Sequence, residues 1–461
     1  MKKVGAFGGW LAVFCVASTS SLDVRGDDAA VAEWGYSVTV DGRSVEVVEI
    51  PAPVHNLRGG NAQPYAYAQF DIAKESVVRV KSVAAVGKDA CLAPKSSKAK
   101  MRRLGANEVS FRMKPSSQLV FEPEGRHRAL VLAANPPETN VPRSDAPGVV
   151  WIGPGRHRRN VRVSSNQTLY LAPGAVVEGQ LVVRGTNVTV RGRGRFDGGA
   201  FGHCKGPARG NMTSIAGSNI RIQDVVFASS WAWCLVLASC NDVCVENVKI
   251  LGGHVLNDDG IDLCRAKDVS IRNSFIRAQD DCIAVKYWAE GVAVEDCTLW
   301  PDFANAVRIG YECDDGRAFR DIAFRRLAVP HLSLVKRKVT HAWANCFLEV
   351  QAANGACVSD LLVEDVAIDS AEQGDNFVIL RTLVVDRASH AGAGAGHIDG
   401  VTLRRVAFPP APPDSMRVQI DAFDAGHGVR NVVFEDVSAH GPLTLRNADA
   451  PVARNGGGTT R

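Results

Sequence analysis

The sequence predicts an all-β protein made of a small antiparallel β-sandwich followed by a right-handed parallel β-helix. A phrase of the form Asn/Asp-Val-x-Val-x-Asn/Asp recurs in the second part at a nearly constant spacing, and periods of roughly 20–50 residues are typical of solenoids. The chain has 43 glycines and only 7% aromatic residues, a mix suited to many turns around a core of small side chains. No long stretch shows the periodicity of an amphipathic helix.

Residues 1–27 are expected to be a secretory signal peptide. Lys2 and Lys3 supply a charged start, and an apolar run follows from Val4 to Ala17. This run is shorter than the ~18–20 apolar residues that span a bilayer. Since no later stretch approaches that length, we expect an exported protein without a membrane span.

Residues 28–133 are expected to form the sandwich. Asp41-Gly42 separates the alternating runs Ser37–Val40 and Ser44–Val47, which is a hairpin signal. Further alternating runs follow at Ser76–Val80, Glu108–Met113, Gln118–Glu122 and Ala129–Leu132. Residues 134–148 contain four prolines and are expected to be a linker.

Residues 149–447 carry the repeat and are expected to form the β-helix. Copies of the phrase begin at Asn219, Asp242, Asp268 and Gly291, so successive copies start 23, 26 and 23 residues apart. Each unit holds two or three short β runs, and it buries its apolar face only by stacking on its neighbours. The end of the chain, residues 448–461, becomes rich in Gly, Thr and Arg and is expected to be disordered.

Two carboxylate clusters, Asn257-Asp258-Asp259-Gly260 and Gln279-Asp280-Asp281-Cys282, each precede a short apolar strand. Neighbouring coils stack about 4.8 Å apart, so equivalent positions form files of side chains. The files expected to face inward are Ile261, Ile283 and Val307, and Leu263, Val285 and Ile309. The file between them is expected to face outward and contains Asp262, Ala284, Arg308 and Glu349.

The bend before each strand defines one more file, which contains Trp233, Asp259, Asp281 and Asn305. Asp259, Asp280 and Asp281 should therefore converge on one surface patch. Aromatic faces stack on sugar rings, and paired carboxylates supply the proton transfers of glycosidic bond hydrolysis, so the patch predicts a saccharide site. The structural alternatives are a turn for Asn-Asp-Asp-Gly, a core position for Trp233, and a surface ion-pair ladder for Arg308 and Glu349.

Composition narrows the function classes further. A formal net charge of +4 on 461 residues is too small to indicate nucleic-acid binding. The chain has 12 cysteines without zinc-like CxxC spacing, so we expect neither a metal nor another cofactor. Several cysteines occupy strand positions where they behave as small buried hydrophobes, and disulfides remain open if the compartment is oxidising.

The block Asn257-x-Asp259-Gly260-Ile261-Asp262 with Gln279-Asp280-Asp281-Cys282 resembles the signature of polygalacturonase-type glycoside hydrolases, family 28. The sandwich and the linker resemble family 49, the dextranase and isopullulanase type. So do Thr168–Ala175, Thr298-Leu299-Trp300 and Asn305–Gly310. Both families are β-helices of the pectin-lyase-like type and inverting hydrolases. The resemblance implies that Asp280 is the general acid and that Asp259 and Asp281 hold and activate water.

Two departures from family 28 bear on the substrate. Polygalacturonases carry Gly-His-Gly where this chain has Ala304-Asn305-Ala306, and their downstream Arg-Ile-Lys, which grips a uronate carboxylate, is absent. We therefore expect a polysaccharide substrate, with a neutral glucan favoured over galacturonan, and a secreted monomeric glycosidase. A polysaccharide lyase or a non-catalytic carbohydrate-binding β-helix remains as an alternative. The residues expected to bind substrate are Trp233, Asn257, Asp262, Lys286, Asn305 and Arg308.

Overall fold

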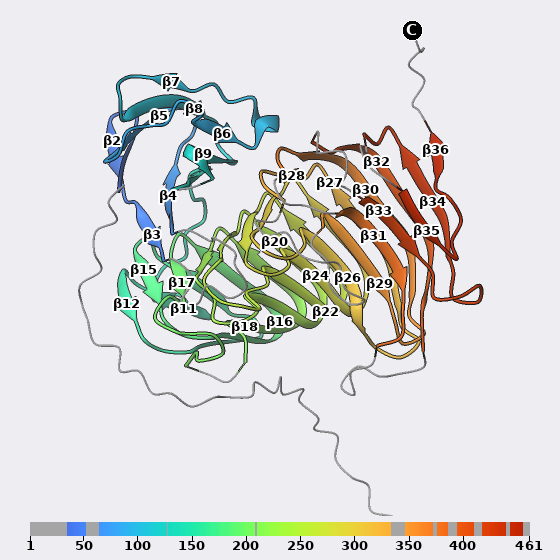
Figure 1. Ribbon diagram of the computed structural model, residues 1–461. Coiled ribbons are helices and arrows are strands. Elements are labelled where there is room, and N and C mark those ends of the chain that lie inside the picture. Colours follow the sequence, from blue (N-terminus) through green and yellow to red (C-terminus); the bar gives the residue numbers. More distant parts are fainter. Residues whose placement is uncertain are drawn as a thin grey trace, which may run out of the picture.

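The computed structural model describes residues 35–51, 64–126, 128–207, 210–332, 346–371, 376–385, 394–409, 417–438 and 443–454. The expected signal peptide, residues 1–27, lies outside these ranges. Figure 1 shows a small two-sheet unit beside a long solenoid whose coils follow the sequence from one end to the other. The predicted fold class, a right-handed parallel β-helix preceded by a small sandwich, is confirmed.

The N-terminal unit consists of two five-stranded sheets. The first sheet has the order β2 (Arg43–Val45), β1 (Tyr36–Val40), β5 (Ser76–Ser82), β8 (Glu108–Met113) and β7 (Arg102–Arg103). The second has the order β3 (Val48–Ile50), β4 (Tyr65–Asp71), β10 (Leu130–Asn135), β9 (Ser117–Arg126) and β6 (Cys91–Ala93), and the 3₁₀ turn η1 (Lys95–Ser97) follows β6. Strands β10 and β4 pair in parallel, which differs from the purely antiparallel sandwich expected, because side-chain alternation carries no information on strand direction.

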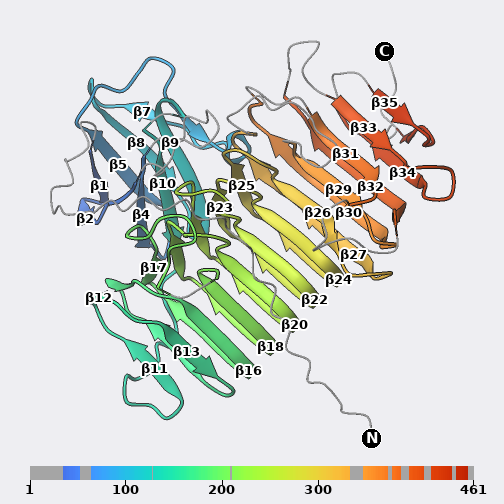
Figure 2. The ribbon, with the colours of Figure 1, turned by 60° about the horizontal axis from the view of Figure 1, so that its bottom comes forward.

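The solenoid is one sheet of 26 strands, each hydrogen-bonded to an equivalent strand on a neighbouring coil (Figure 2). Its first half comprises β11 (Val149–Ile152), β12 (Gly155–His157), β13 (Val161–Ser164), β14 (Thr168–Leu171), β15 (Ala175–Val177), β16 (Leu181–Gly192), β17 (Arg195–Asp197), β18 (Thr213–Gln223), β19 (Val226–Ala228), β20 (Leu235–Glu246), β21 (Lys249–Leu251), β22 (Ile261–Arg272) and β23 (Phe275–Ala278). The second half comprises β24 (Ile283–Glu295), β25 (Thr298–Pro301), β26 (Val307–Cys313), β27 (Ala318–Arg325), β28 (Ala328–Val329), β29 (Leu348–Ala352), β30 (Cys357–Ile368), β31 (Asn376–Thr382), β32 (His397–Ala407), β33 (Arg417–Asp421), β34 (Val429–Glu435), β35 (Leu443–Arg446) and β36 (Val452–Arg454).

The end of the chain departs from its expected disorder. Strand β36 pairs in parallel with β34, so at least residues 452–454 continue the solenoid. The remainder of that stretch, from residue 455, lies outside the described residues. Within the described part of the chain, no helix is long and apolar enough to cross a membrane.

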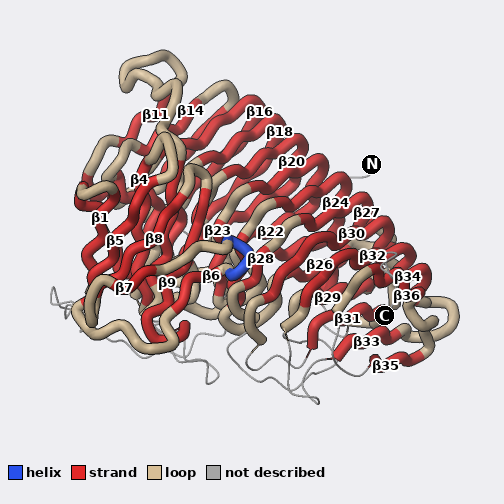
Figure 3. Tube along the Cα trace, turned by 90° about the horizontal axis from the view of Figure 1, so that it is seen from above, coloured by secondary structure: helices blue, strands red, loops and turns tan. Residues whose placement is uncertain are grey.

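The repeated Asn or Asp of the sequence phrase marks a bend of the backbone. Asn219, Asp242 and Asp268 have φ values of 49°, 52° and 51°, and Gly291 has a φ of 67°. Among residues with a side chain, Asn and Asp enter this left-handed region most readily, because their short polar side chains bond locally. The regular spacing of these residues therefore makes the chain turn at the same place in each coil, and the coils stack as parallel rungs (Figure 3).

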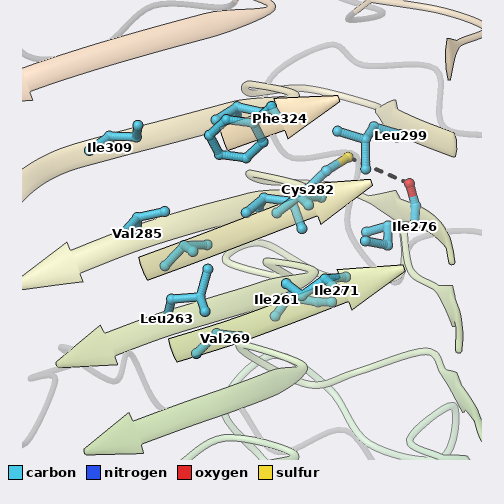
Figure 4. Packing of buried hydrophobic residues seen from close by; sticks show 14 of the residues in the cluster. Ile261, Leu263, Val269, Ile271, Ile276, Cys282, Val285, Leu299, Ile309 and Phe324 are labelled. Atoms are coloured by element: carbon cyan, nitrogen blue, oxygen red, sulfur yellow. Dashed lines mark hydrogen bonds between the residues drawn. The ribbon is translucent and has the colours of Figure 1, made fainter. Parts of the chain in front are cut away.

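The predicted inward files are correct. Ile261 pairs with Ile283, and Ile283 pairs with Val307. Leu263, Val285 and Ile309 form the second file in the same register, and all six side chains are fully buried. Figure 4 shows Leu263, Val285 and Ile309 on three successive strands of one apolar cluster.

Cysteines contribute to this core as small apolar groups. Cys282 is fully buried, and its thiol donates a hydrogen bond of 3.6 Å to the Ile276 carbonyl oxygen (Figure 4). The eleven cysteines in the described ranges are all free thiols, so the disulfides that the sequence left open are not formed among them.

The sandwich packs on the solenoid through a shared apolar cluster that includes Tyr65 from β4 and Trp300 from β25. At its centre, Arg277 lies between these two rings, 4.1 Å from each centroid. Asp302 accepts hydrogen bonds of 2.9 and 3.1 Å from the Arg277 guanidinium, and both side chains are buried. The docked domain thus holds in place the coils that carry the two carboxylate clusters.

Candidate active site

The bends before strands β20, β22, β24 and β26 align as the sequence predicts. Cys234 N donates to Asp259 O at 2.9 Å, Gly260 N donates to Asp281 O at 2.8 Å, and Cys282 N donates to Asn305 O at 2.9 Å. These backbone bonds place Trp233, Asp259, Asp281 and Asn305 at equivalent positions of four successive coils.

Gly260 allows this close stacking. A Cβ atom at Gly260 would lie 2.4 Å from the Cys282 carbonyl oxygen and 2.4 Å from Ile276 Cγ2. No real Cβ tolerates such contacts, so the glycine of Asn-Asp-Asp-Gly is a packing requirement of the coil that presents Asp259.

Asp280 is the least constrained carboxylate of the site. Its side chain is half-buried and makes no hydrogen bond or ion pair with any residue that the structure describes. Burial raises the pKa of Asp280 well above its usual range, and the nearby Asp259 and Asp281 carboxylates raise it further. Arg308 and Lys286 offset only part of this rise. The group is therefore suited to carry a proton and give it away, as a general acid must.

Asp281 is held firmly by contrast. Its Oδ1 accepts hydrogen bonds from the Asn305 backbone N at 3.1 Å and from Asn305 Nδ2 at 2.8 Å. Its Oδ2 lies 3.6 Å from Arg308 Nη1. Two donors and a guanidinium fix the orientation of this buried carboxylate.

Asp259 is held by a different cation. Lys286 Nζ lies 2.8 Å from Asp259 Oδ2 and 2.7 Å from Asp262 Oδ1, and it stands 3.4 Å from the centroid of the Trp233 ring. Burial raises the pKa of Asp259, and Lys286 counteracts that rise. Burial likewise raises the pKa of Asp262 well above its usual range, again with Lys286 acting in the opposite direction.

A second layer of polar side chains supports Asn305 and Arg308. Asn305 Nδ2 also donates to Glu349 Oε2 at 3.2 Å, and Arg308 Nη2 donates to Gln351 Oε1 at 2.8 Å. Gln351 Nε2 in turn donates to Glu349 Oε1 at 3.1 Å. Arg308 and Glu349 pair in register as expected, but they are buried members of this network and form no exposed ladder.

The sequence missed Gln351 and Arg381 in this layer. Arg381 Nη2 lies 3.6 Å from Glu349 Oε1. Gln351 lies on β29, which pairs with β26, and Arg381 lies on β31, which pairs with β29. The file of Glu349 continues to Ile379, whereas Gln351 lies two residues after Glu349 and pairs with Arg381. The signal that could have found them is therefore the next outward-facing file of the same strands.

The structure brings five of the six expected substrate-binding residues to the aspartates: Trp233, Asp262, Lys286, Asn305 and Arg308. Asn257 differs, because it is exposed at a bend with a φ of 52° and bonds to no described side chain. Its neighbour Asp258 is buried instead, and its Oδ2 accepts from Gly253 N at 2.7 Å. The turn reading therefore applies to residues 257–258, while Asp259 joins the site.

Within the described ranges, no three His, Cys, Asp or Glu side chains are arranged to hold a metal ion. Apart from Asp280, the buried polar side chains of the site bond to one another, around Lys286 on one side and around Asn305 and Arg308 on the other.

Comparison with known proteins relates the chain to glycoside hydrolases. Residues 176–304, which contain all three aspartates, match the sequence model of glycosyl hydrolases family 28. An exopolygalacturonase of Arabidopsis thaliana is 27% identical over 170 residues, or 34% of this chain and 40% of that protein. The chain thus spans about two fifths of the length of this curated relative.

Solved structures are similar over most of the chain. Dex49A from Penicillium minioluteum is 14% identical with a TM-score of 0.63, and the match covers 88% of each chain. A family 28 exopolygalacturonase of Yersinia enterocolitica is 12% identical with a TM-score of 0.44, over 91% of this chain and 93% of that one. The likeness to Dex49A shows a shared fold across both the sandwich and the solenoid. The resemblance of this chain to the β-helical glycoside hydrolases of families 28 and 49 is therefore confirmed.

Proposed function

We propose that this protein is a glycoside hydrolase that cleaves O-glycosidic bonds of a polysaccharide. One observation carries the proposal: three carboxylates meet on adjacent coils, and only two of them are held by cations. Asp259 contacts Lys286, Asp281 contacts Asn305 and Arg308, and Asp280 has no such partner. Hydrolysis needs this division, because one carboxyl must donate a proton while another accepts one.

In the proposed reaction, a water oxygen attacks the anomeric carbon as the bond to the leaving oxygen breaks. Asp280 gives its proton to the leaving oxygen. Asp259 and Asp281 hold the water, and one of them receives its proton. The bond electrons leave with the oxygen that Asp280 protonates, and exchange with solvent restores both protonation states.

The stereochemical outcome follows from how the water is held. Carboxylates on adjacent strands start about 4.8 Å apart at the backbone, whereas inverting enzymes usually separate their two groups by ~6.5–9.5 Å. With three carboxylates, the water lies between Asp259 and Asp281 while Asp280 points to the leaving oxygen. No carboxylate has to reach the anomeric carbon, so we propose inversion.

We propose a neutral glucan as the substrate. A uronate needs a cation that is free to bind its carboxylate, but Lys286 is engaged by Asp259 and Asp262, and Arg308 by Gln351 and Asp281.

Gly310 adds to this argument. It follows Arg308-Ile309 with a φ of 84°, and a Cβ atom there would lie 2.0 Å from the Gln351 carbonyl oxygen. A lysine therefore has no room at this position. The Arabidopsis relative is named an exopolygalacturonase, so galacturonan is the competing substrate that the assay must include.

We also propose that residues 1–27 direct export and that the monomeric mature protein acts outside the cell. Sequencing the N-terminus of the exported protein tests this proposal. A mature chain that still begins with Met1 would contradict it.

The purified protein should be incubated with neutral α-glucans and with polygalacturonate, and new reducing ends measured. We expect reducing ends from a neutral α-glucan, little or none from polygalacturonate, and none from the Asp280→Asn variant. Efficient release of galacturonate would overturn the substrate assignment. An unsaturated product that absorbs in the ultraviolet would identify a lyase, and binding without cleavage would identify a non-catalytic solenoid.

A further inference from the structure

Lys286 has no step of its own in the proposed reaction, yet it is the cation buried against Asp259. Its side chain is 4% exposed. The ammonium nitrogen makes ion pairs of 2.8 Å with Asp259 Oδ2 and 2.7 Å with Asp262 Oδ1, and the Trp233 ring lies 3.4 Å away. Carboxylates and an aromatic face thus surround the ammonium, which leaves it poorly placed to bind substrate.

The strand geometry explains why this lysine reaches backward. Lys286 lies opposite Cys264 in the ladder between β22 and β24. Its four-carbon side chain is longer than the spacing of about 4.8 Å between strands, so the ammonium reaches the preceding coil, where Asp259 and Asp262 lie.

We propose that Lys286 is a positioning residue, whose ammonium holds the Asp259 carboxylate in place and ionised while Asp280 stays protonated. This inference rests on the proposed function, because it assigns the role of water-activating base to Asp259. It also replaces the substrate-binding role that the sequence predicted for Lys286.

The contrast between Asp259 and Asp280 supports this assignment. Burial raises the pKa of both carboxyls, but Lys286 donates a hydrogen bond to Asp259 and none to Asp280. A hydrogen-bonded cation stabilises the ionised form of the group it touches. Contact with Lys286 therefore favours the ionised form of Asp259 over that of Asp280, in the direction of the division that acid–base catalysis needs.

The other charged groups near Asp259 act in the opposite direction. Asp281 and Glu312 raise the pKa of Asp259, and the carboxyl of Asp262 lies against the same ammonium. Asp262 and Glu312 also raise the pKa of Lys286 and so stabilise its charge, while the buried Cys264 thiol, whose own pKa burial raises, lies near it as a neutral group. Arg308 is the other nearby cation, and it contacts Asp281 instead. Removing the Lys286 ammonium would leave Asp259 without a cation in contact.

The first test is the pH dependence of kcat/KM for Lys286→Met and Asp262→Asn on the substrate found in the polysaccharide assay. The fall of kcat/KM on the acidic side of the pH profile reports protonation of the base, Asp259. In Lys286→Met this acidic limb should move to higher pH by about one to three units, the effect of a contacting cation on a carboxylate. Asp262→Asn should not move the acidic limb to higher pH, because Lys286 then forms its ion pair with Asp259 alone. An unchanged limb in Lys286→Met, or an upward shift in both variants, would overturn the proposal.

The second test needs no substrate. Without the ammonium, the folded-state pKa of Asp259 and Asp262 rises further above the unfolded value of about 3.9. A carboxyl with a raised folded-state pKa contributes stability that is present below the unfolded pKa and is lost as pH rises through the folded pKa. The wild-type folded-state pKa values are themselves raised, so both proteins first lose stability in parallel as pH rises. Above the wild-type folded-state pKa values, the free energy of unfolding of Lys286→Met should fall increasingly below that of the wild type. A difference that stays constant with pH would indicate packing alone and overturn the proposal.

If Lys286→Met fails to fold, the double variant Lys286→Met/Asp262→Asn removes one cation and one anion together, and its pH profile is compared with that of Asp262→Asn. The two tests also separate this inference from the proposed function. A wild-type protein that cleaves no polysaccharide but passes the stability test refutes only the proposed function. An active protein with a constant stability difference refutes only the role of Lys286.

Discussion

Replacing Asp280 with asparagine should abolish turnover without harming the fold. A general acid contributes about 10²–10⁴-fold to the rate, which corresponds to roughly 3–5 kcal/mol of transition-state stabilisation at ~1.36 kcal/mol for each tenfold. Because the Asp280 carboxyl bonds to no described residue, the amide leaves no donor or acceptor of a neighbour unsatisfied. Substrate binding should therefore persist while kcat falls.

The same variant has an opposite effect on stability. The folded-state pKa of Asp280 lies well above its usual range, so its contribution is fully present at low pH and is lost as pH rises through the folded-state pKa. Asparagine does not ionise, so the variant does not undergo this loss. The free energy of unfolding of Asp280→Asn should therefore increase relative to that of the wild type as pH increases. Reducing-end assays and urea unfolding across pH measure both effects. A variant that keeps more than about a tenth of the wild-type rate would refute the role of Asp280.

Three further substitutions test the support of the site. Asn305→Ala removes the hydrogen bond from Asn305 Nδ2 to Asp281 and keeps the one from the backbone N. It should reduce kcat with little change in fold, as circular dichroism and steady-state kinetics would show; unchanged kcat would contradict the role of the Nδ2 contact. Arg277→Met leaves the buried Asp302 unpaired and should lower the free energy of unfolding by about 3–5 kcal/mol, whereas adding Asp302→Asn should restore much of it. Lys249 is fully buried, and burial lowers its pKa to about 7, so the wild type should gain stability from about pH 7 to pH 10 relative to Lys249→Met; parallel stability curves would show that Lys249 does not titrate in this way.

The stacking of the site could be predicted from the sequence because a solenoid converts spacing into geometry. Once Asn and Asp at the bends set the length of each coil, Asp259 and Asp281 must occupy equivalent positions, and backbone hydrogen bonds between the coils agree. The alternation of inward and outward residues then fixes the files of Leu263 and Val285. These are nearest-neighbour properties, which a repeating sequence encodes directly.

Contacts that cross the repeat could not be predicted in this way. The sequence predicts that the file containing Asp262 and Glu349 points away from the apolar core. It does not predict that these side chains are buried within polar networks and not exposed to solvent. Lys286 was expected to reach substrate and instead reaches the preceding coil, since nothing in strand alternation specifies where a long side chain ends. The pairing of Arg277 with Tyr65 depends on how the sandwich docks, which the repeat does not encode.

The configuration of the first-formed product tests the central claim most directly. Proton NMR during the first turnovers on an active substrate reports the anomer before mutarotation obscures it. If Asp259 and Asp281 hold the water and Asp280 protonates the leaving oxygen, the product has the opposite anomeric configuration to the substrate. A product that keeps the substrate's configuration would show that one of these aspartates acts as a nucleophile and would contradict the account.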